Sequence, residues 1–246
     1  MKMKISHLFL IIGVLVSVLF LDSCLDNDTD SSTLFPNALV TVKHATDNTV
    51  FLQLDNKTTL FPINLKSSPF GTKEVRALVN YEEVKDPSKE YSRAVRVNWI
   101  DSIRTKQMAP NLGAKNKEVY GGDPVEIIND WVTIAEDGYL TLRFRTEWGY
   151  QRATHNVNLV STGNPENPYE VEFLHNANGD SGERVGDGLV AFKLDQLPNT
   201  NGKPVKLRLK WKSYNGEKSI EFDYNGATSK PTISPIAATR GQIPIQ

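Results

Sequence analysis

The most constraining feature of this sequence is a strict two-residue alternation that runs from Val205 to Lys212. Apolar side chains take every second position, and lysine or arginine takes the positions between them. A period of two places successive side chains on opposite faces of a β-strand, so that one face packs and the other meets water. The alternation resumes after Asn215-Gly216, a pair that favours a type I′ hairpin turn because both residues tolerate positive φ.

This turn predicts the register of a hairpin. The predicted pairs are Trp211 with Ile220, Leu209 with Phe222, Leu207 with Tyr224, Lys210 with Glu221 and Arg208 with Asp223. Both faces are satisfied, so the basic row is predicted to be a solvated sheet face with acidic partners rather than a nucleic-acid patch. The balance of 28 basic and 29 acidic residues in the chain also argues against nucleic acid as a partner.

Alternation along the rest of the chain, together with frequent turn residues, indicates an all-β protein. Because the chain has a single cysteine, it cannot form an internal disulfide. The block from 34 to 122 is predicted to be a small five-stranded barrel with Pro62 at the end of its third strand. Its strands are expected at 38–45, 49–55, 59–61, 76–81 and 94–100. Ser102–Gly122 is predicted to be an irregular connection.

The block from 123 to 226 is predicted to form a β-sandwich of two sheets. Besides the hairpin described above, strands are expected at 156–161, 169–175 and 188–194. The segment from 227 to 246 has three prolines and no alternation, and it is predicted to be disordered.

A second hairpin, at Asp137-Gly138, has two alternatives. A two-residue loop would place Ile134 opposite Thr141, which is a poor match. A three-residue loop that starts at Glu136 places Ile134 opposite Leu140. We therefore predict the three-residue loop.

The first thirty residues have the layout of a bacterial export signal. Two lysines precede an apolar run from Leu8 to Leu21, and Cys24 follows it. The run is shorter than the roughly 20 residues that span a bilayer. We predict a lipoprotein signal peptide over 1–23, lipidation of Cys24 and a flexible acidic tether over 24–33.

Two alternatives stay open for this leader. Asp22 is unusual two places before a lipidated cysteine, so a cleaved and secreted form is the main rival. The acidic tether is either a solvated linker or a tag for export to the outer surface. A lipid on Cys24 makes the membrane a partner. It predicts a place in the cell envelope, anchored to the outer membrane and either periplasmic or surface-exposed.

The sequence offers little catalytic chemistry. His44, His155 and His175 are far apart in sequence, and zinc needs clustered nitrogen or sulfur ligands. No nucleophile elbow, phosphate loop or HExxH motif occurs. We predict no catalytic residue and no cofactor, and we expect these histidines to be structural or to lie at the surface.

One polar segment is a weak metal candidate. A calcium loop would use oxygens of Asn176, Asn178, Asp180 and Asp187. The glycine of this segment is misplaced for a calcium loop, so an ordinary Asx/Gly turn is the preferred interpretation.

Several segments of the mature chain carry a recognisable family pattern. They are Val97–Ile103 with Thr105-Lys106, Asp123–Ile127, Asp137–Phe144, His155–Val160, Asn167–Phe173, Gly186–Val190 and Leu209–Ser213. Together they resemble the NigD-like lipoproteins of Bacteroides-type bacteria. The resemblance implies an N-terminal OB barrel followed by a C-terminal β-sandwich. It also implies a role in bacteriocin production or immunity, because the family is named after a gene in a bacteriocin cluster. It brings no catalytic residues.

The first functional hypothesis is an envelope-anchored, non-catalytic binding or interaction lipoprotein with an unknown protein or glycan partner. The alternative is a surface glycan-binding lipoprotein. In that alternative the exposed members of four aromatic residues stack on sugars, namely Tyr91, Trp148, Tyr150 and Tyr169. Core or strand-end packing of these rings is the competing interpretation. A hydrolase with dispersed carboxylates is the third hypothesis.

Overall fold

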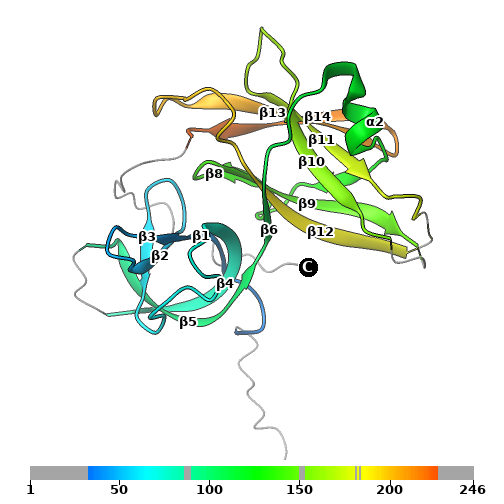
Figure 1. Cartoon of the computed structure of the whole chain (residues 1–246). Coiled ribbons are helices and arrows are strands. Elements are labelled where there is room, and N and C mark those ends of the chain that lie inside the picture. The colour runs from blue at the N-terminus through cyan, green and yellow to red at the C-terminus, as the bar shows by residue number, and fades with distance from the viewer. Residues whose placement is uncertain (1–32, 86–89, 150–152, 181, 183, 227–246) are drawn as a thin grey trace, which may run out of the picture. The chain divides into compact units, whose positions relative to one another are not determined.

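The computed structural model describes residues 33–85, 90–149, 153–180, 182 and 184–226 (Figure 1). The predicted signal peptide, Cys24, almost all of the predicted tether and the predicted disordered tail lie outside these residues. Within the described part, β-strands predominate and form a barrel module followed by a sandwich module. The all-β class is confirmed.

The first module is a closed barrel with the strand order β1-β2-β3-β5-β4, in which β4 pairs with β1 (Figure 1). Its strands are β1 Ala38–His44, β2 Val50–Gln53, β3 Thr59–Pro62, β4 Val75–Val84 and β5 Arg93–Ser102. Only the pairing of β3 with β5 is parallel among these neighbours. The five predicted strands are confirmed. Pro62, which has no N–H to donate, is the last residue of β3.

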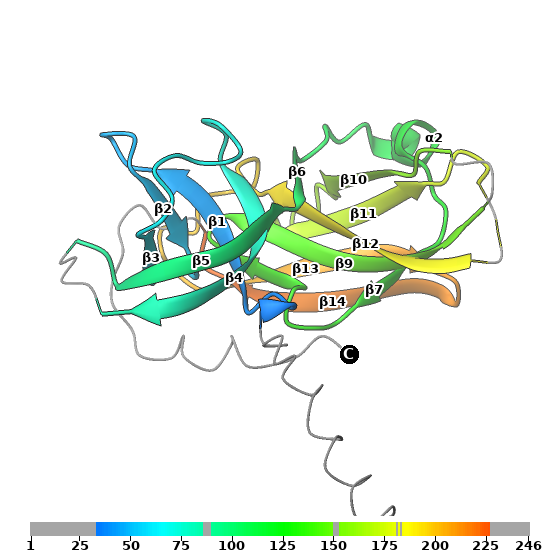
Figure 2. The ribbon, with the colours of Figure 1, turned by 90° about the horizontal axis from the view of Figure 1, so that it is seen from below.

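The inward side chains of the barrel form one buried apolar cluster. Its members include Val40, Val42, Leu52, Leu60 and Val79, none of which is exposed. Figures 1 and 2 show the five strands wrapped around this interior. Because side chains alternate along a strand, the residues between these positions point outward.

The second module packs two sheets against each other. One sheet has the order β10-β11-β13-β14, and the other has the order β6-β12-β9-β7, with β8 paired to β9. The strands of the first sheet are β10 Asn156–Ser161, β11 Glu170–Asn176, β13 Val205–Ser213 and β14 Gly216–Tyr224. Those of the second are β6 Arg104–Gln107, β7 Glu126–Ile128, β8 Ile134–Glu136, β9 Tyr139–Trp148 and β12 Arg184–Lys193.

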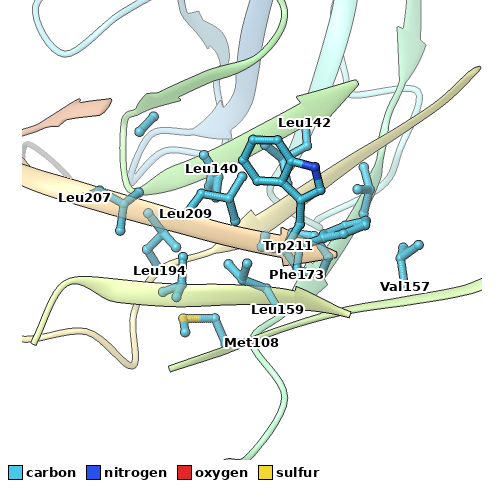
Figure 3. Close-up of a cluster of buried hydrophobic side chains, with 14 of the residues drawn as sticks. Met108, Leu140, Leu142, Val157, Leu159, Phe173, Leu194, Leu207, Leu209 and Trp211 are labelled. Carbon is cyan, nitrogen blue, oxygen red and sulfur yellow. The ribbon is translucent and has the colours of Figure 1, made fainter. Parts of the chain in front are cut away.

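The core of the sandwich lies between its two sheets (Figure 3). Leu140 and Leu142 of β9 belong to the same buried cluster as Leu207 and Leu209 of β13 and Phe173 of β11. Burying one such side chain stabilises a fold by roughly 1.5–3 kcal/mol. The predicted two-sheet sandwich is therefore confirmed, and the apolar half of the 205–212 alternation faces its core.

The prediction that Ser102–Gly122 is irregular is wrong at its start. Arg104–Gln107 forms strand β6, which pairs in parallel with β12, and Met108 joins the sandwich core. None of the four residues of β6 is apolar, so no alternation of apolar and polar residues marks this strand. A 3₁₀ turn, Gly113–Lys115, and the short helix α2, Asn116–Tyr120, follow later in the connection.

The predicted three-residue loop at Asp137-Gly138 is wrong. The hairpin of β8 and β9 has a two-residue loop, with Asp137 at φ 50° and Gly138 at φ 80°. These are the positive φ values that a type I′ turn requires. Ile134 pairs with Thr141, because the adjacent Glu136 is a buried strand residue rather than part of the loop.

The predicted register of the hairpin of β13 and β14 is wrong by two residues. Leu209 pairs with Ile220, and Arg208 pairs with Glu221. The loop is Tyr214-Asn215, one residue earlier than predicted, and the Ser213 hydroxyl accepts the Asn215 N–H at 3.1 Å.

A shift of two residues leaves every side chain of this hairpin on its predicted face. Lys206 pairs with Asp223 at 2.6 Å, and Arg208 pairs with Glu221 at 2.7 Å. The prediction of a solvated basic face with acidic cross-strand partners is confirmed.

Candidate functional site

Much of the outward faces of β1 and of the first half of β4 is buried, although the outward face of a small barrel usually meets water. Leu39 pairs with Leu78 across these strands, and Thr41 pairs with Arg76. Leu39 and Leu78 pack with Val132 and Ala191 of the sandwich. We call this contact the seam. It is made by Leu39, Thr41, Arg76 and Leu78 of the barrel and by Val132, Glu136, Thr141 and Ala191 of the sandwich.

The centre of the seam is a fully buried arginine. The Arg76 side chain is 0% exposed, and its Nη2 lies 2.8 Å from Oε1 of Glu136. Its Nε donates to the Thr141 hydroxyl at 3.2 Å, and its Nη1 donates to the Thr41 hydroxyl at 3.0 Å. A buried ion pair adds little net stability, but a buried charge that loses its partner is strongly destabilising. Arg76 therefore makes one arrangement of β1, β4, β8 and β9 much more favourable than others.

A second ion pair borders the seam at the β8–β9 turn. Lys43 Nζ lies 2.7 Å from Oδ1 of Asp137, whose side chain is 0% exposed. The Asp137 N–H donates to the side-chain oxygen of Asn56 in the β2–β3 turn at 2.6 Å. Burial raises the pKa of Asp137, and the Lys43 ammonium opposes that rise. The second carboxylate oxygen has no hydrogen-bond partner among the described residues.

An open cavity of about 360 Å³ adjoins this ion pair. Lys43 and Glu74 line it from the barrel, and Asp137, Lys193 and Asp195 line it from the sandwich. We call it the seam cavity. Its apolar walls come from Leu194, Leu197, Pro198 and Tyr224. A cavity lined by apolar residues and by side chains of both charge signs suits the binding of a polar ligand or of a side chain of a partner protein.

Glu74 lines both this cavity and a second one of about 330 Å³. It accepts the Tyr139 hydroxyl at 2.5 Å and lies 3.9 Å from Nζ of Lys193. Burial raises the pKa of Tyr139 well above its ordinary value, and the acceptance by Glu74 adds to that rise. Tyr139 is therefore a neutral donor at physiological pH rather than a nucleophile.

Two features of the sequence indicate that the outward face of the barrel is covered at the seam. Ala38–Val42 is almost continuously apolar, which is typical of a strand buried on both faces. Leu78 is apolar at an outward position between Arg76 and Asn80. What the sequence could not show was the partner, because Glu136 lies sixty residues beyond Arg76.

A buried histidine pair lies in the sandwich, where the sequence predicted isolated histidines. Nδ1 of His155 lies 2.9 Å from Nε2 of His175, and Nε2 of His155 lies 3.4 Å from Oδ2 of Asp180. The side chains of His155 and Asp180 are each 2% exposed, and His175 is equally buried. The Trp148 ring stacks on His155 at a centroid distance of 4.0 Å.

Both contacts are satisfied in the tautomers in which His155 donates through Nε2 to Asp180 and His175 donates through Nε2 to His155. Nδ1 of His175 has no side-chain hydrogen-bond partner among the described residues. Burial lowers the pKa of His175 to about 4, and the nearby His155 adds to the shift. The two rings and Asp180 form one buried polar network, although the sequence did not predict that His155 and His175 would meet.

The four calcium-candidate residues fall in two places. Asn176, Asn178 and Asp180 belong to the end of β11 and the turn after it, where the Asn176 side chain accepts the Asn178 N–H at 2.8 Å. Asp187 lies in β12, where Arg143 and Arg145 bind its carboxylate at 2.5 and 2.6 Å. The hydrogen bond from Arg145 is the main cause of its lowered pKa.

The turn itself has the preferred Asx/Gly form, with Asn178 at φ 51° and Gly179 at φ 76°. Calcium binding by Asn176, Asn178, Asp180 and Asp187 stays a prediction. Among the residues that the structure describes, no group of three or more His, Cys, Asp or Glu side chains is placed to hold a metal ion.

The four aromatic residues proposed for sugar stacking have different surroundings. Trp148 stacks on His155, and Tyr169 packs against the sandwich core. Tyr91 stacks on Phe61 outside the barrel at a centroid distance of 5.3 Å. Tyr150 lies outside the described residues. The packing interpretation therefore holds for Trp148 and Tyr169, and Tyr91 is the remaining surface candidate.

Both modules match family models. The model of the NigD-like N-terminal OB domain matches residues 39–103, and the model of the NigD-like C-terminal β-sandwich domain matches residues 107–224. The chain belongs to the NigD-like family. The resemblance found in the sequence is thereby confirmed, together with its OB barrel and β-sandwich. In the part of this NigD-like chain that the structure describes, no helix is long and apolar enough to cross a membrane.

Solved structures of relatives share the architecture. A protein from Parabacteroides distasonis ATCC 8503, described as related to a toxin, is 37% identical with a TM-score of 0.64, and the match covers 76% of this chain and 92% of that one. A protein of unknown function from Bacteroides vulgatus ATCC 8482 is 23% identical with a TM-score of 0.63, over 82% and 97% of the two chains.

A NigD-like immunity protein from Bacteroides caccae ATCC 43185 is 21% identical with a TM-score of 0.54, over 76% of this chain and 96% of that one. At this identity, and at that of the Bacteroides vulgatus protein, the likeness shows the fold alone. A comparison with curated proteins finds no match.

Proposed function

We propose that this NigD-like chain is a lipid-anchored envelope protein that binds a protein toxin and protects the cell against it without catalysis. Membership of the family supports the proposal, since one member is described as an immunity protein and a 37% identical relative is described as related to a toxin. The partner is then a bacteriocin-like protein, and the binding site is the seam cavity.

The observation that carries the binding role is the construction of this cavity from both modules. Lys43 and Glu74 come from the barrel, and Lys193 and Asp195 come from the sandwich. The buried Arg76–Glu136 pair favours one arrangement of the strands that carry these side chains. A preformed site loses less entropy on binding than a flexible one does, which raises affinity without additional contacts.

The membrane anchor is the second part of the proposal. Cys24 follows an apolar leader and receives the lipid, and the acidic residues after it leave the folded modules free of the bilayer. We place the protein on the outer membrane, where it would meet a toxin before the toxin reaches its target. Phase partitioning of the native protein into detergent and the mass of its N-terminal peptide test the anchor, with C24A as the unlipidated control.

The protection test uses a host strain that lacks the gene and a bacteriocin encoded beside it. The wild-type gene is expected to restore growth in the presence of the toxin. The double charge reversal K193E/D195K is expected to lose protection, because it inverts the charges of the cavity wall while the protein is still exported. K206E is the matched control, since Lys206 lies in an exposed pair on the solvated face of β13.

Two results would contradict the proposal. If the deletion strain and its parent are equally sensitive to the toxin, protection is wrong. If K193E/D195K protects as well as the wild type at equal abundance, protection does not depend on the seam cavity.

A further inference from the structure

The first sheet of the sandwich ends at β14, which pairs with β13 alone among the described strands (Figure 2). The opposite end of this sheet is covered, because the Ala109 N–H donates to the Leu159 carbonyl of β10 at 2.8 Å. The pairing of β14 with β13 runs over nine consecutive residues without a bulge, and β14 has no proline. Bulges and prolines protect exposed edge strands in many proteins, and β14 has neither.

The hydrogen bonds of β13 show which backbone groups of β14 face away from it. The Arg208 N–H donates to the Tyr169 carbonyl on the β11 side at 3.0 Å, so Arg208 does not exchange hydrogen bonds with its partner Glu221. In an antiparallel pair such partners both point their N–H and C=O groups outward. Every second residue of β14 has the same direction. These residues are Glu217, Ser219, Glu221 and Asp223.

The outward backbone groups of these four residues have no hydrogen-bond partner in the part of the chain that the structure describes. We call this side of β14 the open edge. A row of unpaired N–H and C=O groups is a template on which another extended chain can add as a strand.

The solvated face of this sheet alternates in charge from strand to strand. Glu170 of β11 lies opposite Arg208 of β13, and Arg208 lies opposite Glu221 of β14. The Arg208 guanidinium is 3.8 Å from the Glu170 carboxylate and 2.7 Å from that of Glu221, so it stands between two acids. A strand added beside β14 would continue this order if it carried basic residues on the same face, because opposite charges on neighbouring strands stabilise a sheet.

The other face of β14 is apolar along most of the open edge. Ile220 and Phe222 pack against the sandwich core and are half-buried. Lys218 lies on this face nearer the turn, where it pairs with Glu126 at 2.8 Å. A charge on the core side of an edge strand discourages pairing, so the usable part of the open edge begins at Ser219.

We propose that the open edge binds an extended segment of a partner protein in which basic and apolar residues alternate. The segment joins the sheet as an additional strand beside Ser219–Asp223. Its apolar side chains cover Ile220 and Phe222, and its basic side chains meet Glu221 and Asp223. Backbone pairing supplies the affinity, and the alternation supplies the specificity. Residues 217–223 do not line the seam cavity, so the inference does not rest on the proposed protection against a toxin.

The probe is a synthetic peptide with the sequence of β13, VKLRLKWKS, because that strand already pairs with β14 on its other side. The full-length lipoprotein in detergent micelles is titrated with it by calorimetry, with empty micelles as the blank. We expect binding. S219P should weaken it at least tenfold, which corresponds to about 1.4 kcal/mol. Proline removes an N–H of the open edge and leaves the ladder with β13 intact. The control S219A keeps that N–H and should stay within about threefold of the wild type.

Two N-methylated peptides test the backbone pairing itself. One carries N-methyl groups at every odd position of VKLRLKWKS, and the other carries them at every even position. Because a strand offers alternate N–H groups to its two sides, only one of these peptides should keep the affinity of the parent peptide. Thermal unfolding of S219P shows that the variant is folded.

The proposal is overturned if VKLRLKWKS does not bind, if S219P binds it as well as the wild type, or if both methylated peptides bind like the parent. Hydrogen exchange tests the other occupants of the open edge. The amides of Ser219, Glu221 and Asp223 should exchange fast in the lipoprotein alone and slowly with the peptide. Slow exchange without the peptide would also overturn the proposal. It would assign the edge to a second copy if it depends on protein concentration, and to residues 227–246 of the same chain if it does not.

Discussion

At the scale of single residues, Arg76 shows how one buried charge can select an arrangement of modules. It is the only arginine among the largest fully buried side chains of the described residues. Its donors are distributed to Glu136, Thr41 and Thr141, so both modules are needed to satisfy it. If the buried Arg76–Glu136 pair selects the arrangement of the modules, removing one charge should destabilise the protein more than removing both charges.

We expect R76M to lower the free energy of unfolding by about 3–5 kcal/mol, because the buried carboxylate of Glu136 loses the positive charge of the Arg76 guanidinium. The double variant R76M/E136L should recover most of this loss, since it removes both charges. Urea denaturation measures both values. The control R208M breaks an exposed pair and should cost at most about 1 kcal/mol. A double variant as unstable as the single one would contradict this account.

The buried histidine pair predicts a pH dependence with a definite sign. The pKa of His175 is about 4 in the folded protein, below its ordinary value of 6.5. Between these values the unfolded chain binds the proton and the folded chain does not. The free energy of unfolding therefore has its full value above pH 6.5, and it falls as the pH drops towards 4.

The expected contribution of His175 is a loss of about 3 kcal/mol between pH 6.5 and 4. H175Q keeps an N–H donor for His155 but cannot titrate, so its curve should lose this part of the slope. H44Q in strand β1 is the control and should follow the wild type. Urea denaturation at several pH values gives the curves. Equal slopes for H175Q and the wild type would show that another group is responsible.

At the scale of elements, sequence alternation predicted the strands and their faces better than their registers. Every second residue of β13 faces the core as expected, but the turn begins at Tyr214 rather than at Asn215. The missing information was the Ser213 hydroxyl, which binds the Asn215 N–H. For the hairpin of β8 and β9, placing apolar residues opposite each other predicted the wrong register. Glu136 is a buried strand residue there, and Arg76, which pairs with it, belongs to the other module.

The corrected β13–β14 turn makes a prediction that separates it from a type I′ turn at Asn215-Gly216. Gly216 has φ 105° and open space around its α-carbon, whereas Asn215 is not among the residues with positive φ. We expect G216A to cost about 1 kcal/mol or more through backbone strain. N215A should change stability by less than about 0.5 kcal/mol. A larger loss for N215A in thermal or urea unfolding would favour the type I′ turn.

At the scale of the whole molecule, the sequence predicted the two modules but not their dependence on each other. Barrel and sandwich follow from local alternation and turn residues, which need no knowledge of distant partners. The seam depends on pairs far apart in the chain, such as Lys43 with Asp137 and Arg76 with Glu136. The same is true of the histidine cluster, where a turn, a strand and an aromatic ring meet.

The seam predicts that barrel and sandwich unfold as one unit. Separating them would expose Leu39 and Leu78 and leave Arg76 without its acceptors, so neither module has a favourable surface alone. Native-state hydrogen exchange followed by mass spectrometry measures the opening free energy of each strand. Peptides from β4 in the barrel and from β13 in the sandwich should give equal values for the slowest amides.

The variant L78D tests the cause of this coupling. It places a carboxylate in the apolar part of the seam without touching the inward cluster of the barrel, so the β4 peptides should open at a lower free energy than the β13 peptides. V185D is the control, because Val185 is an exposed apolar residue of β12. If β4 opens before β13 already in the wild type, the modules are independent. The buried arginine would then stabilise a contact that the fold does not need.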